Sequence, residues 1–139
     1  MKKYIFTLSL ILVLVACDKN DTNRIVEQVK AINPDTLFSS KVQCNSNGVC
    51  GLEVLSKSND LLIKDASLNR GNCQLLDFQT MVGSVNSENM IKELNKKHIY
   101  VDYKNKQLGF GDTVVIWGSC KIVEVNLSTN KGDFTLTFN

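Results

Sequence analysis

The chain has 139 residues, with 16 basic and 14 acidic side chains, one histidine, one proline and one tryptophan. Two of the basic residues lie in the first 16 positions, so the remaining 123 residues carry 14 charges of each sign. Proteins that bind nucleic acid usually carry a basic excess on one face, so we expect no nucleic-acid partner. A length of 123 residues suffices for one domain with a hydrophobic core.

The start of the chain has the layout of an export signal. Lys2 and Lys3 form a basic start, and an uncharged, mainly apolar run follows over residues 4–15. A run of about a dozen residues is shorter than the ~20 that a membrane-spanning helix needs. We therefore expect residues 1–16 to be a signal peptide that is removed.

The end of this leader, Leu14-Val15-Ala16-Cys17, resembles the lipobox of bacterial lipoproteins. The resemblance implies a diacylglyceryl thioether on Cys17, cleavage after Ala16 and acylation of the new amine by a chain such as palmitate. Two or three acyl chains hold a protein almost permanently in a membrane, because each buried methylene contributes about 0.8 kcal/mol. The expected location is the bacterial cell envelope, facing the periplasm. An ordinary cleaved signal, in which Cys17 is incidental, is the alternative.

Asp18 resembles the sorting signal that retains enterobacterial lipoproteins in the inner membrane. Lys19 departs from the acidic or amide residue that strengthens that signal, so the outer membrane stays open as an alternative. The polar residues 17–23 predict a lipid-anchored tether, and residues 24–139 predict a single periplasmic domain.

Four further cysteines, an even number in an exported chain, favour disulfides. Cys44 and Cys50 flank an Asn-Gly turn signal, which favours a Cys44–Cys50 bond across a hairpin and leaves Cys73–Cys120 as the second bond. Four cysteines allow three pairings, so the other two stay open. A zinc site is disfavoured because the spacing is wrong and His98 has no second ligand near it, so we expect no metal and no cofactor.

Helices are expected at two places. Residues 24–33 carry Ile25, Val26, Val29 and Ile32 on one stripe, and Pro34 should stop that helix. Ser87 should cap a second helix in which Met90, Ile91 and Leu94 face inward. Residues 74–82 fit a helix or a strand almost equally.

Strands are expected over most of the rest. The pattern becomes strand-like over residues 41–76, with a separate strand over residues 61–68. Ile99, Val101 and Tyr103 alternate with polar residues, and residues 112–117 are apolar on both sides, as in a central strand. Together with the alternating residues from 123 and from 134, they predict an antiparallel C-terminal meander. The fold class is therefore α+β, with one or two short helices packed on a mainly antiparallel, disulfide-stapled sheet.

A search for chemistry gives no catalytic residue, and we expect no enzyme. His98, the only imidazole, is expected at the surface, and Gly109-Phe110-Gly111-Asp112 is too short for a phosphate loop. Asp60, Asp65 and Asp77 read as isolated surface acids. Trp117 is expected in the core, with a binding role as the less favoured interpretation. A solvated face is expected for Lys96, Lys97, Lys104 and Lys106, which have Glu93 and Asp102 among them.

These observations favour a membrane-anchored, non-catalytic module that binds a periplasmic protein through an edge or loop, with membrane lipid as its second partner through Cys17. By analogy of size, anchor and disulfides, it would be of an immunity, exclusion or inhibitor type. The alternative is a structural accessory of an envelope secretion or conjugation apparatus. A long apolar edge strand would favour that alternative, because it allows assembly by strand addition.

Overall fold

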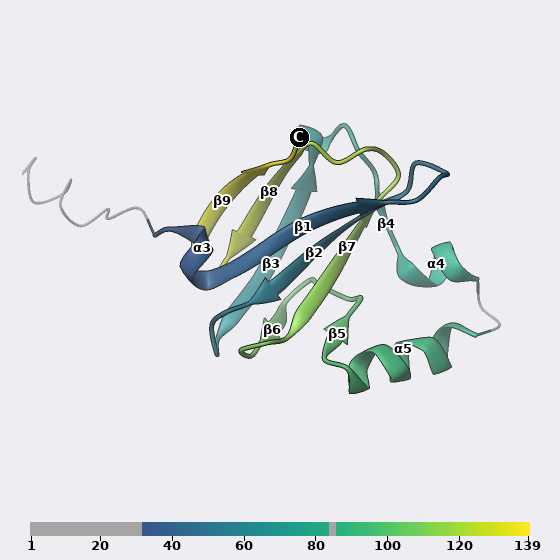
Figure 1. Cartoon of the computed structure of the whole chain (residues 1–139), viewed down its shortest axis with the longest axis horizontal. Helices are drawn as coiled ribbons and strands as arrows, with labels where there is room; N and C mark the ends of the chain where they lie inside the picture. The colour runs from purple at the N-terminus through teal and green to yellow at the C-terminus, as the bar shows by residue number, and fades with distance from the viewer. Residues whose placement is uncertain (1–31, 84–85) are drawn as a thin grey trace, which may run out of the picture. The chain divides into compact units, whose positions relative to one another are not determined.

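A computed structural model describes residues 32–83 and 86–139, and these residues form a two-sheet structure with short helices between strands (Figure 1). The first sheet has the order β1 (Phe38–Cys44), β2 (Cys50–Ser56) and β7 (Thr113–Gly118), and β4 (Leu75–Leu76) and β5 (Ile99–Tyr100) both pair with β7. The second sheet has the order β6 (Lys106–Leu108), β3 (Leu61–Leu68), β8 (Glu124–Thr129) and β9 (Gly132–Thr137). The helices are α3 (Pro34–Leu37), η1 (Asn69–Gly71), α4 (Phe78–Val82) and α5 (Ser87–Lys96).

The hydrophobic core contains residues of both sheets. Alternate residues of each strand are buried, because successive side chains of a strand point to opposite faces. In the first sheet these are Leu52, Val54, Val114 and Ile116, and in the second Leu61, Ile63, Val125 and Leu127. The mixed, mainly antiparallel content agrees with the predicted fold class.

The predicted C-terminal meander is present only in part. β8 and β9 form the expected hairpin, but β7 belongs to the other sheet, where it pairs with β2 in antiparallel and with β5 in parallel orientation. β7 is apolar on both faces: Val114 and Ile116 face the core, and Val115 and Trp117 alternate with them. The second apolar face of β7, with Val115 and Trp117, lies beside Phe78, Ile91 and Tyr103 of the segment between β4 and β6.

The first expected helix lies mostly outside the described residues, as do the expected signal peptide and tether. Its last two positions, Ile32 and Asn33, are not helical. Pro34 does not stop a helix there but begins the short α3, where its missing N–H costs nothing. Asn33 caps α3 by accepting a hydrogen bond from the backbone N–H of Asp35.

The later helices also differ from the expectation in detail. Residues 74–82 divide into β4 and α4, and the side chain of Asp77 accepts the capping hydrogen bond of α4 from Gln79. Ser87 is the first residue of α5, and Asn86 occupies the cap position. Ile91 is half-buried but Met90 is exposed, because α5 contacts β5 and α4 and no broad sheet face.

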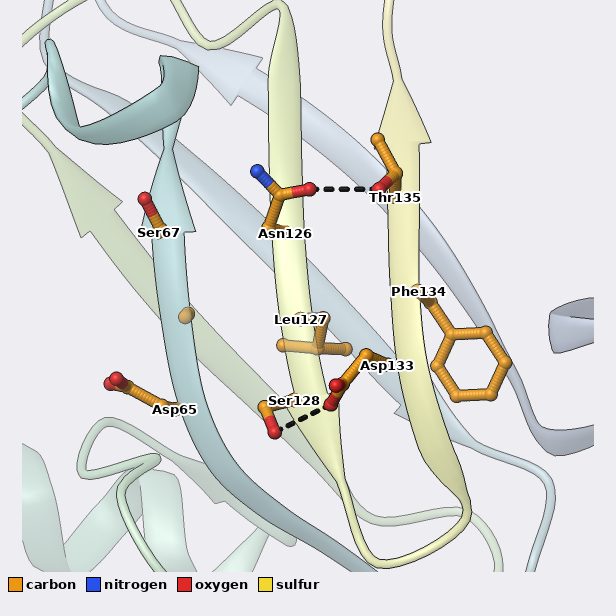
Figure 2. Close-up of a pocket in the computed structure, with 9 residues that line it drawn as sticks. Asp65, Ser67, Asn126, Leu127, Ser128, Asp133, Phe134 and Thr135 are labelled. Carbon is orange, nitrogen blue, oxygen red and sulfur yellow. Dashed lines mark hydrogen bonds between the residues drawn. The ribbon is translucent and has the colours of Figure 1, made fainter.

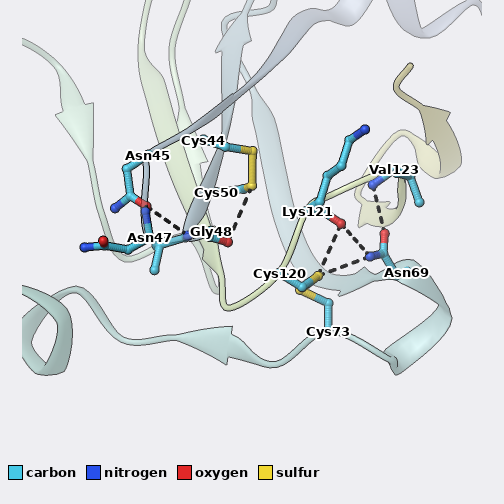
Figure 3. The surroundings of a disulfide bond; sticks show 11 residues. Cys44, Asn45, Asn47, Gly48, Cys50, Asn69, Cys73, Cys120, Lys121 and Val123 are labelled. Carbon is cyan, nitrogen blue, oxygen red and sulfur yellow. Dashed lines mark hydrogen bonds between the residues drawn. A yellow bond between two sulfur atoms is a disulfide. The ribbon is translucent and has the colours of Figure 1, made fainter.

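Two disulfides join Cys44 to Cys50 and Cys73 to Cys120, which is the pairing favoured from the sequence (Figure 3). Cys44 and Cys50 face each other in the β1–β2 register, with Cα atoms 4.0 Å apart. The turn between them is held by Asn45, whose Oδ1 accepts hydrogen bonds from the backbone N–H groups of Asn47 and Val49. Gly48 supplies the positive φ of +79° that this turn needs.

Candidate functional site

Three chain connections meet at one end of the two sheets, together with α3, and we call this the loop end. The β2–β3 loop, the β6–β7 turn and the β8–β9 turn all contribute. Ser56, at the end of β2, exchanges backbone hydrogen bonds with Gly111 and Asp112 of the β6–β7 turn, at 2.9 Å and 2.8 Å. Lys57 joins the same region to α3, because its backbone N–H donates to the carbonyl of Leu37 at 2.8 Å.

The β6–β7 turn is fixed from several directions by Asp112. Its backbone N–H donates to the carbonyl of Gly109 at 3.2 Å, which closes the turn. One carboxylate oxygen accepts the backbone N–H of Gly109 at 2.8 Å, and the other lies 3.0 Å from Nδ1 of His98. Because the Asp112 carboxylate is largely buried, at 15% exposed, these bonds hold the turn in one conformation.

Phe110 is displayed at the tip of this fixed turn. Its side chain is 72% exposed, more than any other large hydrophobic residue among the described residues. Gly111 follows with a φ of +86°, a conformation that glycine adopts without strain. The turn therefore holds a large aromatic side chain in water in a pre-ordered position.

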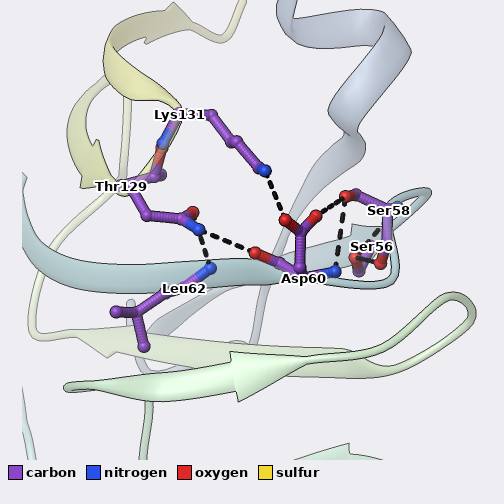
Figure 4. A network of polar contacts seen from close by, with 7 residues as sticks. Ser56, Ser58, Asp60, Leu62, Thr129 and Lys131 are labelled. Carbon is purple, nitrogen blue, oxygen red and sulfur yellow. Dashed lines mark hydrogen bonds and ion pairs between the residues drawn. The ribbon is translucent and has the colours of Figure 1, made fainter.

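The neighbouring loop and turn are joined by a network around Asp60 (Figure 4). The Asp60 carboxylate pairs with the ammonium of Lys131 and accepts a hydrogen bond from the hydroxyl of Ser58 at 2.7 Å. The bond to Lys131 first, and the bond from Ser58 next, lower the pKa of Asp60. Asn130 adds a bond from its Nδ2 to the carbonyl of Asp60 at 2.7 Å and accepts one from the N–H of Leu62 at 2.9 Å. These bonds join the β2–β3 loop to the β8–β9 turn.

The loop end contains one contact between an imidazole and a carboxylate, that of His98 with Asp112. The ring of His98 is 69% exposed, as predicted for a surface residue, but its contact with Asp112 was not foreseen. Neither residue has a hydrogen bond to a serine hydroxyl or a cysteine thiol in the described part of the chain. Residues 32–83 and 86–139 hold no group of three His, Cys, Asp or Glu side chains suited to a metal ion.

A second surface, the outer face of β3, β8 and β9, is polar (Figure 2). Its side chains bond mainly to one another: the hydroxyl of Ser128 donates to Asp133 at 2.7 Å, and that of Thr135 donates to Asn126 at 2.8 Å. A shallow hollow of about 300 Å³ lies on this face and also reaches Asp65. Because its donors and acceptors are largely paired within the chain, this surface offers a ligand less than the exposed ring of Phe110 does.

The predicted isolated acids all have partners. Asp60 pairs with Lys131, Asp65 lies 3.8 Å from the ammonium of Lys104, and Asp77 caps α4. The partners of Asp60 and Asp65 come from distant parts of the sequence, whereas Asp77 bonds to Gln79 two residues further on. The lysine cluster does not form one shared patch. Three of its members have separate partners, with Lys96 bound to Glu93, Lys104 to Asp65, and Lys106 over the ring of Tyr100.

Trp117 is half-buried and does not belong to the core between the sheets. Its ring lies against Gly51, where a Cβ atom would come within 2.8 Å of Cζ3. The expected core position is therefore wrong, because Trp117 falls on the alternate face of β7 from Val114 and Ile116. The expected lipidation site Cys17 and sorting residue Asp18 lie outside the described residues.

The sequence did not single out Phe110 as a binding residue. The available signal was the order Gly109-Phe110-Gly111-Asp112, in which an aromatic residue lies between two glycines and an aspartate follows that can bond to the turn. That signal shows a turn but not how far the ring is exposed, which depends on Ser56 and His98 from other segments.

Comparisons with known proteins add no family. No protein-family model, curated protein or solved structure matches this chain. In the described part of the chain, no helix is long and apolar enough to cross a membrane.

Proposed function

We propose that this chain is a lipoprotein of the bacterial cell envelope, anchored through Cys17 and facing the periplasm, which binds a protein partner without catalysing a reaction. The observation that supports binding is the 72% exposed ring of Phe110 on a turn that Asp112 and Ser56 hold in place. Aromatic residues on rigid supports are frequent at the energetic centre of protein interfaces, because little conformational entropy is lost on binding. The anchor rests on the lipobox resemblance of residues 14–17.

In this proposal the loop end is the contact surface. Phe110 enters an apolar pocket of the partner, and the polar loop around Asp60 and Lys131 forms the rim, which resembles the general arrangement of protein interfaces. The lipid raises the local concentration of the module near a partner in or at the membrane, without any added contact. An immunity, exclusion or inhibitor role would use the same surface, and inner-membrane retention through Asp18 is part of the proposal.

The test is site-specific photocrosslinking in native membranes. A photoreactive phenylalanine analogue at position 110 should give one discrete adduct, and the same analogue at position 47, at the tip of the β1–β2 turn, should give none. With the partner identified, Phe110→Ala should weaken binding about 30-fold or more, which is typical for a residue at the centre of an interface. Adducts of equal yield at both positions, or unchanged affinity of Phe110→Ala, would contradict the proposal.

The alternative role, a structural accessory of an envelope apparatus, is favoured by one observation. β1 is a seven-residue strand without proline at the edge of the first sheet, so it is open to strand addition, but it is mainly polar and does not have the apolar character named as the criterion for this role. Its exposed Lys41 is bound to Glu53 of β2 and does not block the edge by itself. A photoreactive residue at position 41 that forms an adduct, where position 110 forms none, would support this role instead.

A further inference from the structure

A hollow of about 470 Å³ lies beside the first sheet, away from the loop end, and we call it the aromatic hollow. Three aromatic side chains line it: Phe78 at the start of α4, Trp117 on β7 and Tyr103 in the segment after β5. A hollow of this size falls in the range of small-molecule sites, and its lining is about half polar and half apolar.

The charges at the aromatic hollow have one sign. Asp77 and Asp102 are among its lining residues, and no lysine, arginine or histidine of the described chain is. Both aspartates are exposed, so their carboxylates stand at the rim and not in the apolar interior. Burial first, and then the charges of Asp65 and Asp102, raise the pKa of the Tyr103 hydroxyl, which agrees with a negative potential at this rim.

One polar atom of Trp117 lacks a partner among the described residues. The indole nitrogen Nε1 of Trp117 is buried and donates to no acceptor in residues 32–83 and 86–139. Buried donors are nearly always paired, and one that is not calls for an explanation. Because this nitrogen is covered by protein atoms, it does not open into the hollow, and Trp117 offers a ligand its ring and not this donor.

We propose that the aromatic hollow binds an organic cation with an apolar body. Aromatic faces attract ammonium groups, most strongly where water is partly excluded, and carboxylates at the rim add to that attraction. Phe78 supplies an almost fully buried aromatic wall, at 6% exposed. This site is independent of Phe110 and of the proposed protein partner, so either proposal can fail alone.

Trp117 is the sole tryptophan of the chain, so its fluorescence reports on the aromatic hollow directly. The full chain, extracted from membranes in detergent, would be titrated with choline and, separately, with 3,3-dimethylbutan-1-ol, its uncharged isostere of similar shape. We expect a saturable change in fluorescence with choline. The affinity for the isostere should be at least about ten-fold weaker, as a cation–aromatic interaction predicts.

The matched variants are Asp102→Asn at the hollow and Asp133→Asn on the outer face of the second sheet. Asp102→Asn should weaken choline binding about five-fold, and Asp133→Asn should leave it unchanged. Unfolding midpoints equal to that of the parent chain would show that both variants are folded. The absence of a saturable change with choline, equal affinity for the isostere, or equal effects of both variants would overturn the proposal.

Discussion

Two carboxylates near the two ends of β8, the exposed Asp60 and the partly buried Glu124, hold their protons less tightly than free ones. Asp60 has its pKa lowered by Lys131 and then by Ser58, and Glu124 has its pKa lowered by a two-bond pairing with Arg70. In both cases the two partners are far apart in the sequence, so each pair joins segments that folding must bring together. These pairs therefore make stability depend on pH.

We expect Lys131→Met to reduce the free energy of unfolding at neutral pH, and this difference from the parent chain to vanish in acid. A folded-state pKa that is lowered means that the pair stabilises the protein above the unfolded-state pKa of Asp60. That stability is lost as the pH falls through the folded-state pKa, because a protonated carboxyl no longer attracts Lys131. Urea unfolding at a series of values from about pH 7 to about pH 2 measures the difference.

Lys121→Met is the control for this series, because the exposed Lys121 makes no ion pair with a described residue. Its unfolding free energy should follow that of the parent chain at every pH. A Lys131→Met difference of constant size down to the acid limit would show that Lys131 acts through packing and not through its charge.

The two disulfides constrain very different lengths of chain. Cys44–Cys50 closes a hairpin that Asn45 and Gly48 already shape, with a sequence separation of 6. Cys73–Cys120 has a sequence separation of 47 and joins the segment before β4 to the segment after β7. The long bond therefore removes far more freedom from the unfolded chain.

Replacing Cys73 and Cys120 together by alanine should cost about 4 kcal/mol of unfolding free energy, against about 2.4 kcal/mol for the double replacement of Cys44 and Cys50. The physical reason is the entropy of the unfolded chain, which rises more when the longer loop is opened. Chemical denaturation of the two double variants under non-reducing conditions gives both values. A smaller loss for the longer bond would contradict this order.

Local sequence signals predicted individual elements well and their partners poorly. The Asn-Gly turn and the alternation in β8 and β9 are written in short stretches of sequence, and both hairpins are present. The strand partners of β7 could not be predicted from a short stretch, because β2 lies about 60 residues earlier and an apolar strand fits several neighbours equally. The same reason explains Phe110: the turn is local, but its exposure depends on Ser56 and His98.

The described domain begins at the same end as the displayed turn. Lys57 binds α3 both through its backbone and through its side chain, whose ammonium donates to the carbonyl of Asp35 at 3.0 Å. A chain of 15 residues from Cys17 to Ile32 reaches at most about 50 Å. In the proposed anchored form, this length sets an upper limit on the distance between the membrane surface and the start of the described domain.

The anchor itself is tested by Cys17→Ser. We expect this variant to remain unprocessed and to carry no acyl mass, because an oxygen cannot form the thioether that the lipobox resemblance implies. Intact-mass analysis of the parent chain from membranes should show Cys17 as the first residue with acyl chains attached. A soluble parent product with a free Cys17 thiol would refute the anchor.

The pairing of β2 with β7 has a consequence for the order of assembly. Register partners such as Cys50 and Gly118 are separated by most of the domain. When the chain is synthesised or exported with its N-terminus first, the first sheet can therefore form completely only after β7 has emerged. Until then Cys73 has no native partner and is free to form a wrong bond with an earlier thiol. Early closure of the Cys44–Cys50 disulfide would remove the thiols of Cys44 and Cys50 from this competition. The bond across the short loop would thus favour correct formation of the Cys73–Cys120 bond.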